Sequence, residues 1–391
     1  MEALSCAILT LALVAALSLL SKGFFPQPQK LKLPPGPKPW PIIGNLSLIG
    51  PLPHQSLHKL SQKYGPIMKL MFGSYPVVIA SSAEMARQFL KTHDHIFASR
   101  PETAAGDWIP WAQCLDLQGY VKRMKALKKK FDRFHDHVLD EHKENMKEVK
   151  DFVSKDMVDL LMQLAEDPDI EVKLNYDSVK GFTQDLIAGG TDTSATTVEW
   201  AMSELMKQPH LIEKATEELD IVIGRERWVE EKDIAQLHYI DAIMKETMRM
   251  HPVAVMLAPH LALEDCNVAG YDICKGTRVF INTWSMGRDP SQWNAPEEFN
   301  PDRFLGKAID VKGQNFELLP FGSGRRMCPG YSLGLKMIRS SLANLLHGFN
   351  WKLPDNATTE DLSMEEVFGL ATPRKFPLVA VLEPRLPLYL Y

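Results

Sequence analysis

The pattern of hydrophobic and polar positions along the chain predicts a mainly helical protein with a small β portion. From residue 119 onward, apolar residues recur at intervals of three and four, the spacing of an amphipathic helix. Short runs rich in β-branched and aromatic residues indicate strands. The expected helices are 83–92, 120–147, 156–165, 176–208 (ended by Pro209), 237–251 and 328–347, and the expected strands are 69–71, 76–79 and a β-rich stretch over 260–281.

The N-terminal stretch has a different pattern. Residues 3–20 carry no charge, and these 18 residues are just long enough to cross a bilayer as a helix. Glu2 precedes them, and the basic residues follow: Lys22, Lys30, Lys32 and Lys38. Because positive charge favours the cytosolic side, we expect a transmembrane anchor with the main domain in the cytosol. A cleaved secretory signal is the alternative, but the basic residues that open a signal peptide are missing here.

A proline-rich segment comes next, with five prolines among residues 33–41. Such a run cannot be helical and forms a stiff, extended spacer. The predicted organisation is therefore an anchor over 3–20, a hinge over 21–41 and a main domain over 42–391.

Composition and charge narrow the function. The chain is 45% hydrophobic and 24% charged, as in globular proteins, and its net charge of −5 offers no footprint for nucleic acid. The cysteines form no CxxC pair and no even framework, which favours unpaired thiols in a reducing compartment. They are Cys6, Cys114, Cys266, Cys274 and Cys328.

The segment 321–330, FGSGRRMCPG, is the strongest candidate site. Gly322 and Gly324 permit tight turns and a close approach to a flat ligand. Pro329 suits the first position of a helix, so Cys328 is expected at a helix N-terminus, where a thiolate and hence metal binding are favoured. Arg326 can reach a carboxylate at the edge of the ligand. A buried structural cysteine is the alternative, and the glycines, arginine and proline argue against it.

This segment resembles the haem-binding signature of the cytochrome P450 family at each fixed position. The matching residues are Phe321, Gly324, Arg326, Cys328 and Gly330. The resemblance implies the P450 fold, haem (iron protoporphyrin IX) as cofactor and Cys328 as its axial iron ligand through the thiolate.

A second motif lies on the helix expected at 237–251. Glu246 and Arg249 are three residues apart and so meet on one helix face. An exposed ion pair of little energy is the alternative for such a pair. Residues 299–304, FNPDRF, resemble the family's meander motif, whose arginine completes a Glu–Arg–Arg triad. The resemblance implies a structural triad of Glu246, Arg249 and Arg303 that locks the region holding the haem loop.

A third motif, AGGTDTS at 188–194, lies within a predicted long helix. Two glycines in a helix cost roughly 1 kcal/mol each, so something should offset them. Small residues let a helix pass over a planar ligand, the Thr193 hydroxyl can perturb the helical hydrogen bonds, and Asp192 can relay protons. A helix crossing packed through small residues is the alternative. The P450 oxygen-activating motif has the same acid–threonine pair.

Further assignments come from the resemblance alone. Segments 253–259 and 368–372 resemble substrate-contact segments, with ordinary core packing as the alternative. His260 would hold a haem propionate. The implied substrate-contact residues are Ala188, Val255, Leu257 and Leu370.

Electrons must come from another protein, because the sequence has no dinucleotide fingerprint. For an anchored member of this family, the resemblance implies NADPH-cytochrome P450 reductase as partner, O₂ and a small molecule as substrates, and the endoplasmic reticulum membrane as location.

The chain departs from its family at one point. Residues 106–111 and 115–119 resemble those that close the first half of the domain in the flavonoid 3′-hydroxylase-like plant members. Here they follow directly after 97–101, which belong before the first haem-contacting helix. About 100 residues, the size of a small domain, are therefore expected to be missing between Ala105 and Gly106. The family's Trp-Arg pair is missing too, since none of the eight tryptophans precedes an arginine.

Two functions follow. One is an active monooxygenase that inserts one atom of O₂ into a small apolar or phenolic plant metabolite, a flavonoid or phenylpropanoid first and a terpenoid second. The other is a truncated, catalytically inactive paralogue or splice form without haem. Peroxide-rearranging haem-thiolate enzymes are disfavoured, because the acid–threonine pair suits O₂ activation.

Overall fold

The structure is a computed structural model that describes residues 31–101, 119–148, 152–171, 173–354 and 357–391. It is mainly helical with small sheets, as the sequence predicts. The predicted anchor at 3–20, Cys6, Cys114 and residues 106–111 lie outside the described residues. Among the helices of the described ranges, none is long and apolar enough to cross a membrane.

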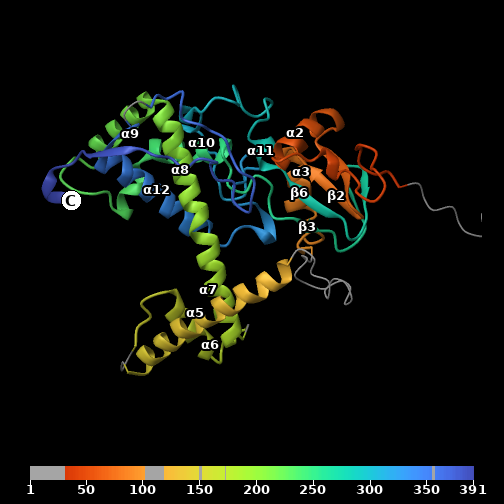
Figure 1. The fold of residues 1–391 in the computed structure, drawn as a ribbon, viewed down its shortest axis with the longest axis horizontal. Coiled ribbons are helices and arrows are strands. Elements are labelled where there is room, and N and C mark those ends of the chain that lie inside the picture. The colour runs from red at the N-terminus through yellow and green to blue at the C-terminus, as the bar shows by residue number, and fades with distance from the viewer. Residues whose placement is uncertain (1–30, 102–118, 149–151, 172, 355–356) are drawn as a thin grey trace, which may run out of the picture.

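A four-stranded sheet in the order β1-β2-β6-β3 forms one side of the molecule (Figure 1). β1 (Ile67–Phe72) and β2 (Tyr75–Ala80) make an antiparallel hairpin whose turn uses Gly73 at φ +60. This confirms the predicted pair of short strands. β6 (Arg278–Ile281) pairs parallel with β2, and β3 (His260–Leu261) closes the sheet antiparallel to β6.

Short helices pack around this sheet. They are α2 (Pro53–Tyr64), α3 (Ala83–Arg87) with its π-helical continuation η2 (Gln88–Thr92), α11 (Thr283–Met286) and the 3-10 turn η1 (Leu46–Leu48). Phe89 and Phe97 are fully buried in the core beside the sheet, with ring centroids 4.9 Å apart. This core supports the segments that later meet the cysteine loop.

The proline-rich segment is extended, as predicted, and it pairs with neighbouring strands. Lys69 N donates to Pro35 O at 2.8 Å, and Asp272 N donates to Lys32 O at 2.8 Å. Asp272 belongs to the hairpin of β4 (Cys266–Val268) and β5 (Tyr271–Ile273). Cys266 and Cys274 beside this hairpin are free thiols, which confirms the unpaired state expected for them.

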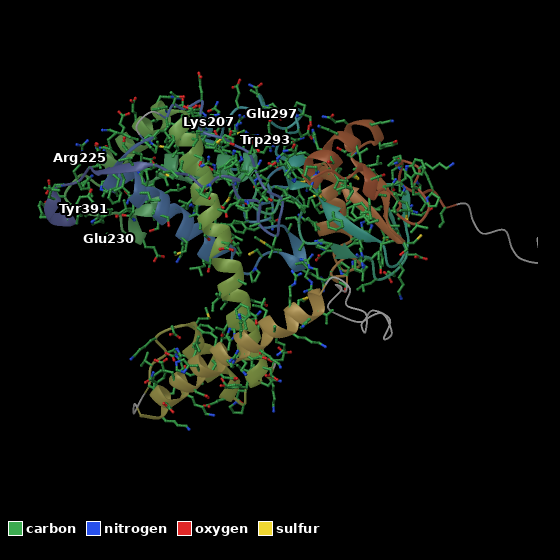
Figure 2. The ribbon with its side chains drawn as sticks, viewed as in Figure 1. Lys207, Arg225, Glu230, Trp293, Glu297 and Tyr391 are labelled. Atoms are coloured by element: carbon green, nitrogen blue, oxygen red, sulfur yellow. The ribbon has the colours of Figure 1, made fainter. Side chains whose placement is uncertain are left out.

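The helical body contains α8 (Asp192–Lys207), α9 (Pro209–Val222), α10 (His238–Met250) and α12 (Tyr331–Gly348). Their apolar faces share one core, in which Leu205, Ile243 and Leu342 are fully buried. The remaining elements are η3 (Glu231–Gln236), η4 (Pro301–Phe304), η5 (Gly324–Arg326), β7 (Phe349–Lys352), β8 (Val381–Pro384) and η6 (Leu388–Leu390). Figure 2 shows Arg225, Glu230 and Tyr391 together at the end far from the four-stranded sheet.

A separate helical lobe, residues 119–190, consists of α5 (Tyr120–Glu148), α6 (Met157–Glu166) and α7 (Tyr176–Gly190). It has its own small core around Leu139, Leu161 and Val179. Figure 1 shows the lobe standing away from the body, with α7 and α8 as the connection.

Two predicted helix boundaries are wrong. The single helix expected over 176–208 is two helices, α7 and α8, which are interrupted at Thr191. Its expected end before Pro209 is confirmed: α8 ends at Lys207, and Pro209 begins α9, because proline lacks the N–H that the first turn of a helix leaves unpaired. The last helix begins at Tyr331 rather than at Cys328, since residues 329–330 form a turn before it.

Candidate functional site

The backbone of residues 321–330 folds back on itself to present Cys328. Cys328 N donates to Phe321 O at 2.9 Å, and Met327 N donates to Gly324 O at 3.1 Å. The Cys328 side chain is exposed. α12 begins three residues later, so Cys328 lies in the turn before the helix and not at its first position. The loop therefore offers an accessible sulfur on a hydrogen-bonded backbone.

Gly324 lets this loop sit directly on η2. Its φ is +72, and a Cβ there would lie 2.3 Å from Leu90 O and 2.8 Å from Asp94 Oδ1. Asp94 accepts from Arg325 N at 3.2 Å and pairs with Arg325 Nε at 3.3 Å. Gly322, at φ +71, is buried against Leu257. Gly324 is thus required by its close contacts and its positive φ, and Gly322 by its positive φ.

Three cationic or potentially cationic side chains gather next to the loop. Arg326 Nε donates to Ala98 O at 2.5 Å, and Arg100 donates to Ala258 O at 2.5 Å and to Pro259 O at 3.0 Å. The buried His260 ring bonds through Nδ1 to Phe97 O at 2.8 Å. Burial, and next the charge of Arg326, lower the pKa of Arg100. A bound anion would relieve the repulsion between these two guanidinium groups.

The electrostatics of His260 follow from the same cluster. Burial is the main cause that lowers its pKa, with the charges of Arg100 and Arg326 adding to it against the hydrogen bond to Phe97 O. Because Nδ1 donates to that carbonyl, the second nitrogen accepts a hydrogen bond unless it takes up a proton. Nε2 of the neutral ring would repel an anion with its lone pair, so an anion would bind there only when Nε2 is protonated.

Arg100 is the residue of this cluster that sequence reasoning missed. It is the fourth residue of 97–101, a segment that served above only to show where the missing stretch begins. The available signal was an arginine directly before a proline, which holds the backbone extended. Its approach to Arg326, 226 positions later, depends on tertiary structure.

The predicted triad is assembled as expected. Arg249 donates from Nε to Glu246 Oε2 at 2.7 Å and from Nη2 to Oε1 at 2.8 Å. Arg303, on η4, donates from Nε to Glu246 Oε1 at 2.9 Å. Glu246 and Arg249 are fully buried, so the alternative of an exposed pair is wrong.

The 188–193 segment is exposed along its whole length. Thr193 Oγ1 donates to Gly189 O at 2.7 Å, and Thr191 Oγ1 donates to Ile187 O at 2.8 Å. A threonine hydroxyl that donates to a carbonyl one turn earlier can bend a helix. Both bonds are of this kind, and the helix is interrupted at Thr191, the donor of one of them. A Cβ at Gly189 or Gly190 would meet nothing within 4 Å, so a crossing helix among the described residues does not account for them.

α8 is fixed to the rest of the site through Trp200. Its ring stacks on His251 at 4.1 Å with an interplanar angle of 4°, and His251 bonds to Glu204 Oε1 at 2.6 Å. Trp200 Nε1 donates to Thr372 O at 3.0 Å. α8, the end of α10 and the segment 368–372 therefore meet at one buried indole.

The four predicted substrate-contact residues lie in different environments. Val255 and Leu257 are 3% and 8% exposed, and Leu257 belongs to the core beside the sheet. Leu370 is fully exposed at 101%, and Ala188 is exposed on α7. Burial of Val255 and Leu257 agrees with ordinary core packing, whereas Leu370 and Ala188 have open space beside them.

Comparison with known proteins gives a family. The sequence profile of the cytochrome P450 family matches residues 34–115 and 104–379. Dimethylnonatriene synthase of Zea mays is 38% identical over 100% of this chain and 99% of its own length, and a flavonoid 3′-monooxygenase of Petunia hybrida is 34% identical over 100% of both. A zebrafish cytochrome P450 structure with abiraterone has a TM-score of 0.71 at 22% identity, covering 86% of this chain and 100% of that one.

The same comparisons bear on the predicted internal gap. The two alignments run over 527 and 514 positions, against 391 residues in this chain, so more positions are aligned than this chain has residues to fill. The two profile matches meet at residues 104–115. This is the place where the sequence predicts the missing segment.

Proposed function

The chain belongs to the cytochrome P450 family, and on this premise we propose that it is a haem-thiolate monooxygenase acting on a small apolar or phenolic plant metabolite. Haem is the expected cofactor of this family and fold. The observation that carries the proposal is the exposed Cys328 thiol on a glycine loop, with Arg100, Arg326 and His260 gathered beside it.

These residues fit haem by the chemistry of their donors. Cys328 would ligate the iron through its exposed thiol. Arg326, Arg100 and His260 would hold its carboxylates, which offsets the mutual repulsion of the two guanidinium groups. When bound, haem supplies the activation of O₂.

Asp192 and Thr193 would supply and relay protons. Asp192 is exposed, so its carboxylate can exchange protons with water. The Thr193 hydroxyl already donates to Gly189 O, so its oxygen is left to accept a hydrogen bond from water. Trp200 positions this helix against the substrate-side segment through Thr372.

The substrate class rests on the apolar side chains and on the relatives. Leu370 and Ala188, which have open space beside them, present only hydrocarbon to a ligand, which suits a flavonoid or phenylpropanoid body with few polar groups. The names of the relatives support two classes, a flavonoid 3′-monooxygenase and a dimethylnonatriene synthase. An acyclic terpenoid is therefore the alternative substrate, and it has the support of the higher identity.

We place the enzyme at the endoplasmic reticulum membrane through residues 3–20, with NADPH-cytochrome P450 reductase as electron donor. Support for the anchor is the uncharged stretch followed by lysines. Support for a separate electron donor is that the sequence has no dinucleotide fingerprint.

The exposure of residues expected to face a ligand favours a second function. Residues 188–193 and Leu370 are exposed, and the alignments run over more positions than this chain has residues to fill. A chain that cannot cover the oxygen side would be an inactive paralogue or splice form that does not retain haem.

The reduced carbon monoxide difference spectrum of the full chain separates these functions. The Soret band of a thiolate-ligated ferrous complex supports the monooxygenase, and Cys328→Ser should abolish it. Lack of haem in this chain, together with the band in a version that carries the missing segment of a flavonoid 3′-monooxygenase, overturns the proposal in favour of the inactive form. A haem-loaded chain is then assayed with a flavanone and with an acyclic terpene alcohol.

A further inference from the structure

His142, in the helical lobe, lies between two carboxylates at the start of α6. Its Nδ1 is 2.6 Å from Asp159 Oδ1, and its Nε2 is 3.8 Å from Asp156 Oδ2. The three groups are the one set of histidine, cysteine and acidic side chains in the described ranges whose ligand atoms lie within 4.8 Å of one another. His142 comes from α5 and the carboxylates from the first turn of α6, so the cluster joins two helices.

Asp159 determines which nitrogen of His142 carries the proton. Its side chain is 4% exposed, and its Oδ2 accepts from Lys155 N at 2.9 Å. Its Oδ1 faces the His142 ring and its Oδ2 faces a backbone N–H, so both oxygens lie opposite hydrogen-bond donors when the carboxylate is ionised. Because an ionised carboxylate only accepts, Nδ1 donates to it. In neutral His142 the lone pair is then on Nε2.

Asp156 presents a free oxygen to that lone pair. Its Oδ1 caps α6 by accepting from Val158 N at 2.9 Å and from Asp159 N at 3.0 Å. Its Oδ2 is 3.8 Å from His142 Nε2, which is longer than a hydrogen bond. Two acceptors at this spacing suit a shared cation, because Zn²⁺ takes nitrogen and carboxylate oxygen at about 2.0–2.2 Å each.

We propose that His142 Nε2 and Asp156 Oδ2 bind a Zn²⁺ ion, with Asp159 orienting the histidine from its other side. A zinc-binding histidine that gives its second N–H to a carboxylate is a recurring arrangement in zinc sites. The side chains of His142 and Asp156 are 21% and 52% exposed, so an ion reaches them from solvent and water completes its coordination. Bound zinc would hold α5 against α6. The site is independent of haem and of Cys328.

The test is zinc titration of the full chain by calorimetry, after chelator treatment and in the Cys328→Ser background, which removes the exposed thiol as a competing ligand. We expect one-to-one binding with a rise in the melting temperature, and no binding of Mg²⁺, which prefers an all-oxygen shell. Asp159→Asn should weaken zinc binding about 10–100-fold.

Asp156→Ser separates ligation from folding. Serine caps a helix as aspartate does, so the melting temperature without zinc should stay unchanged while the one-to-one binding is lost. His142→Gln should lose it as well, and His137→Ala, at an exposed histidine of the same helix, should keep it. Equal zinc affinity in the Asp156→Ser variant, or equal loss in the His137→Ala variant, would show adventitious binding and overturn the proposal.

Discussion

Arg303 donates from Nε to Glu246 Oε1 at 2.9 Å, and this bond ties the η4 segment to α10 across 57 positions of the chain. Glu246 also accepts two bonds from Arg249, and Oε1 accepts from Asn300 N at 2.7 Å. One fully buried carboxylate thus accepts hydrogen bonds from two guanidinium groups and holds a backbone segment.

Glu246→Gln should therefore lower the free energy of unfolding by about 3–5 kcal/mol, since it leaves buried positive charge uncompensated. Urea denaturation measures this loss. The control is Asp302→Asn in the same segment, whose half-exposed pair with Lys214 is worth about 0–1 kcal/mol. Similar small losses in both variants would contradict a central role for the triad.

Gly324→Ala should displace the cysteine loop. The residue has φ +72, and the new Cβ would fall 2.3 Å from Leu90 O, which is backbone and cannot rotate away. We expect a loss of at least about 2 kcal/mol from the strained conformation and the contact together. Chemical denaturation and the reactivity of the Cys328 thiol report the change. An unaltered thiol reactivity would mean that the loop does not depend on this contact.

Gly181→Ala should have the opposite effect. Gly181 lies inside α7, and a Cβ there would meet nothing within 4 Å. Alanine has the higher helix propensity, so stability of the lobe should rise by about 0.5–1 kcal/mol. Hydrogen exchange of the α7 amides is the measurement, and faster exchange in the variant would refute it.

Acid should weaken the structure through Asp233. Its carboxylate accepts from Arg227 Nη1 at 2.6 Å and Nη2 at 3.0 Å, and these bonds are the main cause that lowers its pKa from 3.8 to about 2. Because the pKa of Asp233 is lower in the folded than in the unfolded protein, its ionised carboxylate stabilises the fold at pH values above the pKa of the unfolded state. This contribution is lost as the pH falls from about 4 to about 2.

Asp233→Asn should consequently cost about 1–2 kcal/mol at pH 6, with the magnitude reduced because Arg227 is partly exposed to water. The difference from the unsubstituted protein should vanish near pH 2 in denaturant titrations repeated across this range. A difference that stays constant with pH would exclude the ionised pair as its cause.

Several elements could be predicted from local sequence. The β1–β2 hairpin, α5, α6 and α10 agree with their expected ranges to within about two residues, because their hydrophobic period and boundary residues are local. The boundaries at Thr191 and at Tyr331 could not be predicted in this way. Side-chain bonds from Thr191 and Thr193 compete with the helical pattern, and the turn after Cys328 follows its own backbone bonds.

The cysteine loop and the acid–threonine pair are short motifs whose residue types carry their chemistry, so the sequence by itself predicted them. The triad was predicted from two separate motifs through the family resemblance, and tertiary structure brought Arg303 to Glu246. Tertiary structure alone decided their surroundings. It brought Arg100 beside Arg326, buried Val255 and Leu257, and stacked His251 on Trp200. It also left residues 188–193 exposed. Burial depends on what packs against a residue from distant parts of the chain, and no local pattern records that.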